Sequence, residues 1–267
     1  MRHPFFALER PIVIGHRGCA GEAPENTLAS FERALACGAA VLESDVHLTR
    51  DGFPVLIHDD DVDRCTEGSG AVAEFDLAGL QKLDAGYRFT PDHGRSHPAR
   101  GGGHRIPTLL EALRAFPGAR FNLELKQAVP GIVERTLAAV QAADRAASCL
   151  LTAADDALMA ELRTRVRRDD VPVALGACTG EVAEVARAAA AGRPVPPGPM
   201  ALQIPSEFAG QPLVTRALID CARAHDIQVH VWTIDEPDEM ARLLELGVDG
   251  IVTNFPARMV ELLAAHS

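Results

Sequence analysis

The sequence predicts an α/β protein, a (β/α)8 TIM barrel built as one domain over residues 1–267, with a small insertion after the second strand. Short apolar runs alternate with longer segments of helical period, which is the pattern of repeated βα units on a parallel sheet. Eight such pairs can be counted, and a chain of 267 residues is long enough for one barrel with an insertion.

The expected strands and helices alternate regularly along the chain. The strands are Ile12–Gly15, Val41–Val46, Arg120–Leu125, Cys149–Thr152, Pro172–Leu175, Ala201–Ile204, Gln228–Thr233 and Gly250–Thr253. The helices are Glu25–Cys37, Leu109–Phe116, Gly131–Ala143, Ala154–Val166, Thr179–Ala191, Thr215–His225, Glu236–Leu246 and Ala257–Ala265. Eight strands and eight helices in this order predict a closed barrel.

A ninth apolar run, Phe53–Ile57, follows the second strand after residues 50–52 only. A parallel crossover needs about a dozen residues, so this run predicts an antiparallel hairpin that extends the second strand. Residues 59–105, approximately, lack sustained periodicity and are rich in Gly, Asp and His. A segment of this kind in a compact domain predicts a lid or a small insertion.

The composition disfavours nucleic-acid-binding, membrane-spanning and secreted proteins. A formal net charge of −11 disfavours a nucleic-acid partner, because affinity for phosphate backbones needs clustered Lys and Arg. No stretch approaches the roughly 18 apolar residues of a membrane span, and Met1–Arg10 lacks a secretory h-region. We therefore expect a cytoplasmic protein without stable membrane insertion. The oligomeric state stays open, with a homo-oligomer as one alternative.

The six cysteines form no C-x-x-C pair, so the sequence predicts neither a zinc knuckle nor a disulfide framework. We expect most of them to be small buried hydrophobic residues. Cys19 lies beside the candidate site, but a lone thiol is weak evidence for a nucleophile.

Polar residues cluster at the expected carboxyl ends of strands, where barrel enzymes carry their active sites. Glu43 and Asp45 are two apart on one strand, so both should face the barrel interior. Glu124 on the next barrel strand completes an all-oxygen cluster suited to Mg²⁺ or Ca²⁺. Surface salt bridging is the alternative for any one acid, but three converging acids favour the metal site.

Histidine and basic side chains are expected beside these acids. His16 and His58 should lie near the same rim, and two imidazoles can act in turn as base and acid. Arg17 and Lys126 supply positive charge for a phosphate, or merely neutralise the acids. Additional pocket residues, at the ends of the sixth and seventh strands, are Gln203 and Trp232.

These features together resemble the glycerophosphodiester phosphodiesterase family. Seven fragments occur in the family's order over nearly the whole chain, and such an ordered set is highly specific although each fragment alone is weak. They are His16-Arg17-Gly18, Pro24-Glu25-Asn26-Thr27, Glu43-x-Asp45, His58-Asp59, Ile106-Pro107-Thr108-Leu109, Asn122-Leu123-Glu124-Leu125-Lys126 and Val231-Trp232-Thr233.

The resemblance implies a role for each part of the site. It implies a divalent cation held by Glu43, Asp45 and Glu124, with Glu25 close to the metal site. It also implies that His16 and His58 form the acid–base pair, and that Arg17 and Lys126 bind phosphate. The implied reaction is hydrolysis of a glycerophosphodiester to glycerol 3-phosphate and an alcohol. Many family members carry Asp where this chain has Asn254, which we expect to cap the last helix.

Two other functions fit the same pattern. A lysophospholipase D-like enzyme would use the same chemistry on a substrate with a long apolar chain, for which Phe75, Tyr87 and Phe89 could line the mouth of the pocket. A non-catalytic barrel that binds a phosphorylated metabolite is the second alternative. The two histidines argue against it, because a binding protein has no evident use for two proton-transfer groups. An aldolase or isomerase is disfavoured because Lys126 follows an expected metal ligand.

Overall fold

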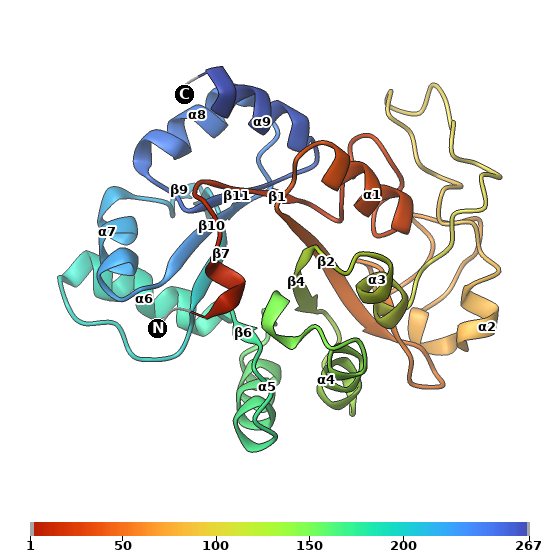
Figure 1. Cartoon of the computed structure of the whole chain (residues 1–267), viewed down its shortest axis with the longest axis horizontal. Helices are drawn as coiled ribbons and strands as arrows, with labels where there is room; N and C mark the ends of the chain where they lie inside the picture. The colour runs from red at the N-terminus through yellow and green to blue at the C-terminus, as the bar shows by residue number, and fades with distance from the viewer. Residues whose placement is uncertain (1–2, 266–267) are drawn as a thin grey trace.

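Eight parallel strands form a nearly closed barrel inside a ring of helices in the computed structural model, which describes residues 3–265 (Figure 1). The strands are β1 (Ile12–Gly15), β2 (Val41–Leu48), β4 (Arg120–Leu125), β5 (Cys149–Thr152), β6 (Ala174–Leu175), β7 (Ala201–Pro205), β10 (Gln228–Trp232) and β11 (Gly250–Thr253). Their order is β6-β5-β4-β2-β1-β11-β10-β7. The ring closes where Met200 N–H, just before β7, donates to the Leu175 carbonyl of β6 at 2.9 Å. The predicted barrel is confirmed.

The helices that follow these strands are also those expected. They are α1 (Leu28–Ala36), α3 (Leu109–Ala115), α4 (Ile132–Ala142), α5 (Asp156–Arg168), α6 (Thr179–Ala191), α7 (Arg216–Ala224), α8 (Pro237–Leu246) and α9 (Pro256–Ala265). Helix α1 starts later than predicted, because Thr27 caps it by accepting from Ser30 N–H at 3.2 Å and Asn26 has a φ of +57°. No helix within residues 3–265 combines the length and apolarity needed to cross a bilayer.

Side-chain alternation along the strands separates an inner core from an outer one. Ile12, Ile14 and Val41 point into the barrel, where they pack with Phe5 and Phe6 of the 3₁₀ helix η1 (Pro4–Phe6). Their neighbours Val13 and Leu42 pack outward against the helices. Because alternate residues share a face, the inward positions that follow Val41 are Glu43 and Asp45. The strands therefore carry an apolar plug at their amino ends and acids at their carboxyl ends.

The predicted hairpin is present as β3 (Pro54–Leu56), which pairs antiparallel with β2. The insertion that follows contains η2 (Val72–Glu74) and α2 (Leu77–Leu80) and packs around an apolar cluster that it shares with β3 and Ile106. It lies outside the ring at one edge of the molecule, drawn in orange to yellow in Figure 1.

Two features of the strands were not expected. A small hairpin, β8 (Glu207–Phe208) and β9 (Gln211–Pro212), follows β7. Strand β6 is two residues shorter than the predicted segment, which began at Pro172, a residue that has no N–H to donate to a neighbouring strand.

Candidate active site

A row of inward-facing polar side chains lies at the carboxyl ends of β2 and β4. Glu43 pairs in register with Asn122, and Asp45 with Glu124, so all four side chains lie on the same face of the sheet. Glu43 is 9% exposed and Asp45 is 1% exposed. Burial, together with the charge of Asp45, raises the pKa of Glu43 well above its usual range. Two adjacent buried carboxylates favour a proton or a cation between them.

Two basic side chains partly offset this negative charge. The backbone N–H of Arg17 donates to Glu43 Oε2 at 2.9 Å, and Arg17 Nε lies 3.4 Å from Asp45 Oδ2. Lys126 Nζ lies 2.7 Å from Glu124 and 3.3 Å from Asp45. Burial alone would lower the pKa of Lys126, but Asp45 and Glu124 outweigh it, so the pKa of Lys126 is raised and the side chain stays cationic.

A third cation reaches the site from the insertion. Arg64 binds both oxygens of Glu25, at 2.6 and 2.8 Å, and its Nε lies 2.5 Å from Asp59 Oδ2. Burial would raise the pKa of each acid, but the neighbouring basic groups outweigh it. Arg64 and Arg17 lower the pKa of Glu25 to about 2. Arg64 and His58 lower the pKa of Asp59 to about 2. This ion-pair network fastens the insertion to the turn that precedes α1.

Two contacts fix His58, one at its imidazole and one at its backbone carbonyl. Its Nδ1 lies 2.6 Å from Asp59 Oδ1, and because an ionised carboxylate only accepts, Nδ1 carries the proton. His47, fully buried, donates from Nε2 to the His58 carbonyl at 3.0 Å. The remaining ring nitrogen of His58, Nε2, is the one left for a substrate.

The imidazole of His16 is fixed by a residue at the far end of the chain. Asn254 Nδ2 donates to Asp235 Oδ2 at 2.7 Å, so the other end of the amide, Oδ1, faces His16 Nδ1 at 2.7 Å. An amide oxygen only accepts, so His16 Nδ1 carries the proton and Nε2 has the free lone pair. Burial and the charge of Arg17 lower the pKa of His16, which keeps the ring neutral at pH 7. The two polar groups of the Asn254 side chain thus bind His16 and Asp235 and not the backbone of α9. The prediction that Asn254 caps the last helix is wrong.

All nine predicted site residues line one pocket of about 480 Å³. Within it, Gln203 Nε2 donates to Asn122 Oδ1 at 2.6 Å, while the buried Gln203 Oε1 has no hydrogen-bond partner among residues 3–265. Trp232 is 44% exposed and borders the pocket. The wall opposite the acids is apolar and includes Val182, Ile204, Phe208 and Leu213.

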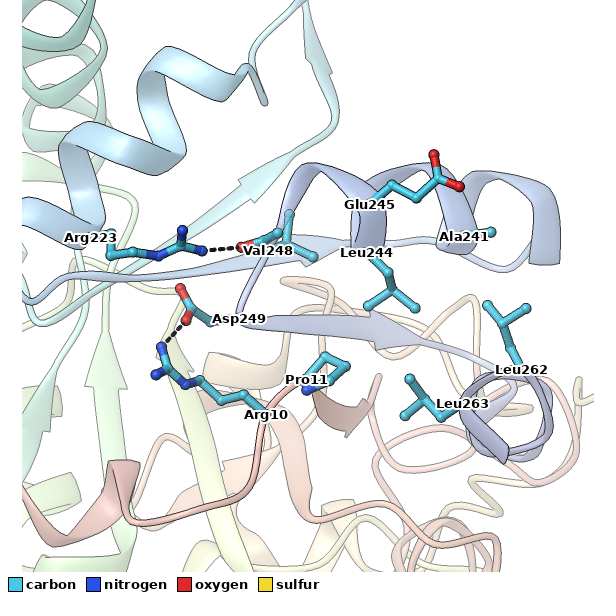
Figure 2. Close-up of a pocket in the computed structure, with 11 residues that line it drawn as sticks. Arg10, Pro11, Arg223, Ala241, Leu244, Glu245, Val248, Asp249, Leu262 and Leu263 are labelled. Atoms are coloured by element: carbon cyan, nitrogen blue, oxygen red, sulfur yellow. Dashed lines mark hydrogen bonds and ion pairs between the residues drawn. The ribbon is translucent and has the colours of Figure 1, made fainter. Parts of the chain in front are cut away.

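A second cavity, of about 560 Å³, lies at the opposite ends of the strands, just before β1 and β11. Figure 2 shows Pro11 and leucine side chains along one wall and Arg10 turned toward Asp249 on the other. Although this cavity is larger, it lacks a histidine and lies at the amino ends of the strands, the face that contributes stability in TIM barrels. The pocket at the carboxyl ends is therefore the candidate active site.

The chemistry of this pocket fits a hard divalent cation. In the pocket and directly beside it, five carboxylates meet three cationic side chains, which leaves a formal charge of −2. The acids are Glu43, Asp45 and Glu124 in the pocket with Glu25 and Asp59 beside it, and the bases are Arg17 and Lys126 in the pocket with Arg64 beside it. Oxygen donors are those that Mg²⁺ and Ca²⁺ prefer. The oxygens of the three predicted ligands do not all lie within 4.8 Å of one another, and Lys126 contacts two of them.

Sequence reasoning missed several residues of the site. Arg64 lies in a segment without periodicity, and nothing local marks it as a partner of Glu25. Asp235 and His47 are also ordinary polar residues in sequence. Asn26 was noted only as part of a helix start, yet its Nδ2 donates to Asp45 at 3.0 Å.

Ionised and imidazole side chains gathered at the carboxyl ends of barrel strands are the arrangement of a TIM-barrel enzyme. Arginine and lysine beside them suit an anionic group on the substrate. The fold and the site therefore define a barrel enzyme that acts on an anionic substrate.

Comparison with known proteins identifies the family. Residues 16–258 match the glycerophosphoryl diester phosphodiesterase family. A glycerophosphodiester phosphodiesterase of Caldanaerobacter subterraneus subsp. tengcongensis is 30% identical over 95% of this chain and 98% of its own. The human lysophospholipase D GDPD1 is 26% identical over 94% of this chain and 85% of its own. The chain belongs to the glycerophosphodiester phosphodiesterase family.

A solved structure agrees with this assignment. An Oleispira antarctica phosphodiesterase, in complex with the product sn-glycerol-3-phosphate, has a TM-score of 0.73 with this chain at 27% identity, covering 95% of this chain and 97% of its own.

Proposed function

We propose that this protein hydrolyses glycerophosphodiesters to sn-glycerol 3-phosphate and an alcohol. We propose further that it uses Mg²⁺ or Ca²⁺ held by Glu43, Asp45 and Glu124. The observation that carries the proposal is the pair of imidazoles in one pocket, each with its Nδ1–H bonded to a fixed oxygen. Such anchoring presents both Nε2 atoms for proton transfer.

The two histidines have different surroundings, which favour different roles. His16 is bonded to a neutral amide and has a lowered pKa, so it is the base: its Nε2 takes the proton of the attacking hydroxyl, from water or from the neighbouring glycerol hydroxyl. His58 is bonded to the Asp59 carboxylate, which can share the charge of an imidazolium. His58 is therefore the acid, and its Nε2–H gives a proton to the oxygen of the leaving alcohol.

The cationic side chains bind the phosphate. Arg17 and Lys126 contact the acids at present, and the same donors can turn to phosphoryl oxygens. A bound divalent cation would supply further charge stabilisation at those oxygens. Gln203 and Trp232 both line the pocket, where Gln203 would contact the substrate and Trp232 would contact the alcohol.

Alanine substitution of each histidine tests the assignment. We expect His16→Ala and His58→Ala to lower kcat by about 10²- to 10⁴-fold, the usual contribution of a general acid or base. Circular dichroism and the melting temperature should stay near those of the wild type. His93, exposed in the insertion, provides the matched control, and His93→Ala should keep full turnover. Near-normal turnover in both active-site variants would show that the acid–base assignment is wrong.

The apolar wall of the pocket favours one second candidate, hydrolysis of lysophospholipids. Phe208 of the β8–β9 hairpin is 69% exposed beside the pocket, where an acyl chain could pack. The similarity to a human lysophospholipase D is consistent with such a substrate. The comparison to make is the kcat/KM for glycerophosphocholine against that for lysophosphatidylcholine. A ratio that favours the lysolipid, and that falls in Phe208→Ser, would support this candidate.

A further inference from the structure

A group of three potential metal ligands lies outside the active-site pocket. In residues 3–265, Cys19, Glu22 and Cys37 form the only group of three His, Cys, Asp or Glu side chains whose ligand atoms all lie within 4.8 Å of one another. Cys19 and Glu22 belong to the loop between β1 and α1, and Cys37 caps the carboxyl end of α1. The loop folds back along the helix, as the hydrogen bonds from Cys19 N–H to Ser30 show.

We propose that Cys19, Glu22 and Cys37 form a binding site for a thiophilic divalent cation, with Zn²⁺ as the best fit. Two sulfurs and one carboxylate oxygen are a donor set that Zn²⁺ accepts, and water can complete the usual four ligands. The hard cations suited to the all-oxygen site of β2 and β4 bind sulfur poorly. The cysteine site therefore disfavours the cations proposed for the all-oxygen site.

The surroundings of the three side chains allow a cation to enter and bind. Cys19 is fully buried, Cys37 is half-buried and Glu22 is exposed, so the site is open on one side. Arg33 binds the Oε2 oxygen of Glu22, with Nε at 2.7 Å and Nη2 at 2.6 Å. The other oxygen is left for the metal. Burial raises the pKa of the Cys19 thiol to about 12, so binding must release protons.

This site is connected to the active site through Asn254. The Sγ of Cys19 lies 3.7 Å from the Asn254 carbonyl, and the side chain of Asn254 binds His16. A cation that pulls Cys19 toward Cys37 would shift this contact. We therefore expect occupancy to lower turnover. That consequence rests on the proposed function, whereas metal binding itself does not.

Cadmium titration of the full-length, reduced protein tests binding directly, because thiolate ligands give Cd²⁺ a charge-transfer absorption that carboxylates do not. We expect the band to saturate at one equivalent, to be lost in Cys37→Ser, and to remain in Glu43→Gln and in the control Cys221→Ser. Excess Zn²⁺ should compete with Cd²⁺ for the site and weaken the band. A titration without a band, or a band that persists in Cys37→Ser, would overturn the proposal.

Alkylation of the wild-type protein provides a second test that does not depend on a variant folding. Zn²⁺ should slow the labelling of Cys37 by iodoacetamide and leave the labelling of Cys221 unchanged. Equal labelling with and without Zn²⁺ would contradict the site. A protein mass lower by two hydrogens after mild oxidation in the presence of Zn²⁺ would also contradict the site. Such a loss would indicate a Cys19–Cys37 disulfide, in which the thiols pair with each other in preference to the metal.

Discussion

Replacing Asn254 with alanine tests the support of the proposed base. The change removes the 2.7 Å hydrogen bond to His16 Nδ1 and one of the three hydrogen bonds that Asp235 accepts from residues 253 and 254. A net hydrogen bond between neutral groups contributes about 0.5–1.5 kcal/mol. The same bond selects the tautomer with Nε2 free, so losing it also lowers the fraction of enzyme in the active form. We expect kcat to fall by about 10-fold, since about 1.4 kcal/mol corresponds to that factor.

The pH dependence of the same variant gives a second, independent readout. The bond to Asn254 raises the pKa of His16 against the larger effects of burial and Arg17, which lower it. Without Asn254 the pKa of His16 should fall further. His16 would then stay unprotonated to lower pH, so the acid limb of kcat/KM should move to lower pH while the plateau drops.

Steady-state kinetics across pH 4–9, approximately, would measure both effects on one substrate. Thr253→Val provides the control, because it removes a different hydrogen bond to Asp235 and leaves His16 untouched. Wild-type kcat and an unmoved acid limb in Asn254→Ala would show that Asn254 does not support His16. The same would follow if Thr253→Val lost as much activity as Asn254→Ala.

Two further substitutions test other parts of the site. Arg64 holds Glu25 and Asp59 with pKa values of about 2, so their contribution to stability is present above about pH 4.5 and is lost as pH falls toward 2. The melting temperature of Arg64→Ala should therefore lie below that of the wild type at pH 7. The difference between the two melting temperatures should be smaller at a pH of about 2. A difference that does not change with pH would contradict this. A Cβ on Gly176 would lie 2.3 Å from Gln203 Oε1 and 2.8 Å from Thr152 Cβ and Oγ1. Gly176→Ala should therefore displace the Gln203 amide and raise KM more than it lowers kcat. An unchanged KM would argue against a substrate contact by Gln203.

The barrel and the acid row could be predicted because both depend on local periodicity. Apolar runs of four to six residues between helical segments indicate buried parallel strands, and a spacing of two places Glu43 and Asp45 on one face. Fixed strand ends then bring residues from different strands to one rim, which is why the nine predicted residues share a pocket.

Other contacts could not be predicted, because they join segments far apart in sequence through loops without periodicity. Asn254 reaches His16 across 238 positions, and Arg64 reaches Glu25 across 39. The closeness of Cys19 and Cys37 depends on how one loop folds along α1, which residue spacing does not encode. The helix-cap expectation for Asn254 was wrong for the same reason, since it weighed only neighbours in the chain.

Release of sn-glycerol 3-phosphate by the purified protein is the most direct test of the proposed activity. The substrates are glycerophosphocholine, glycerophosphoethanolamine and glycerophosphoglycerol, each with Mg²⁺, Ca²⁺ or EDTA. We predict release with at least one cation, its loss in EDTA, and its loss in Glu43→Gln at an unchanged melting temperature. Absence of release with every cation and substrate would contradict the account and favour a lysophospholipid substrate or a binding role. Full release in EDTA would contradict the proposed cation.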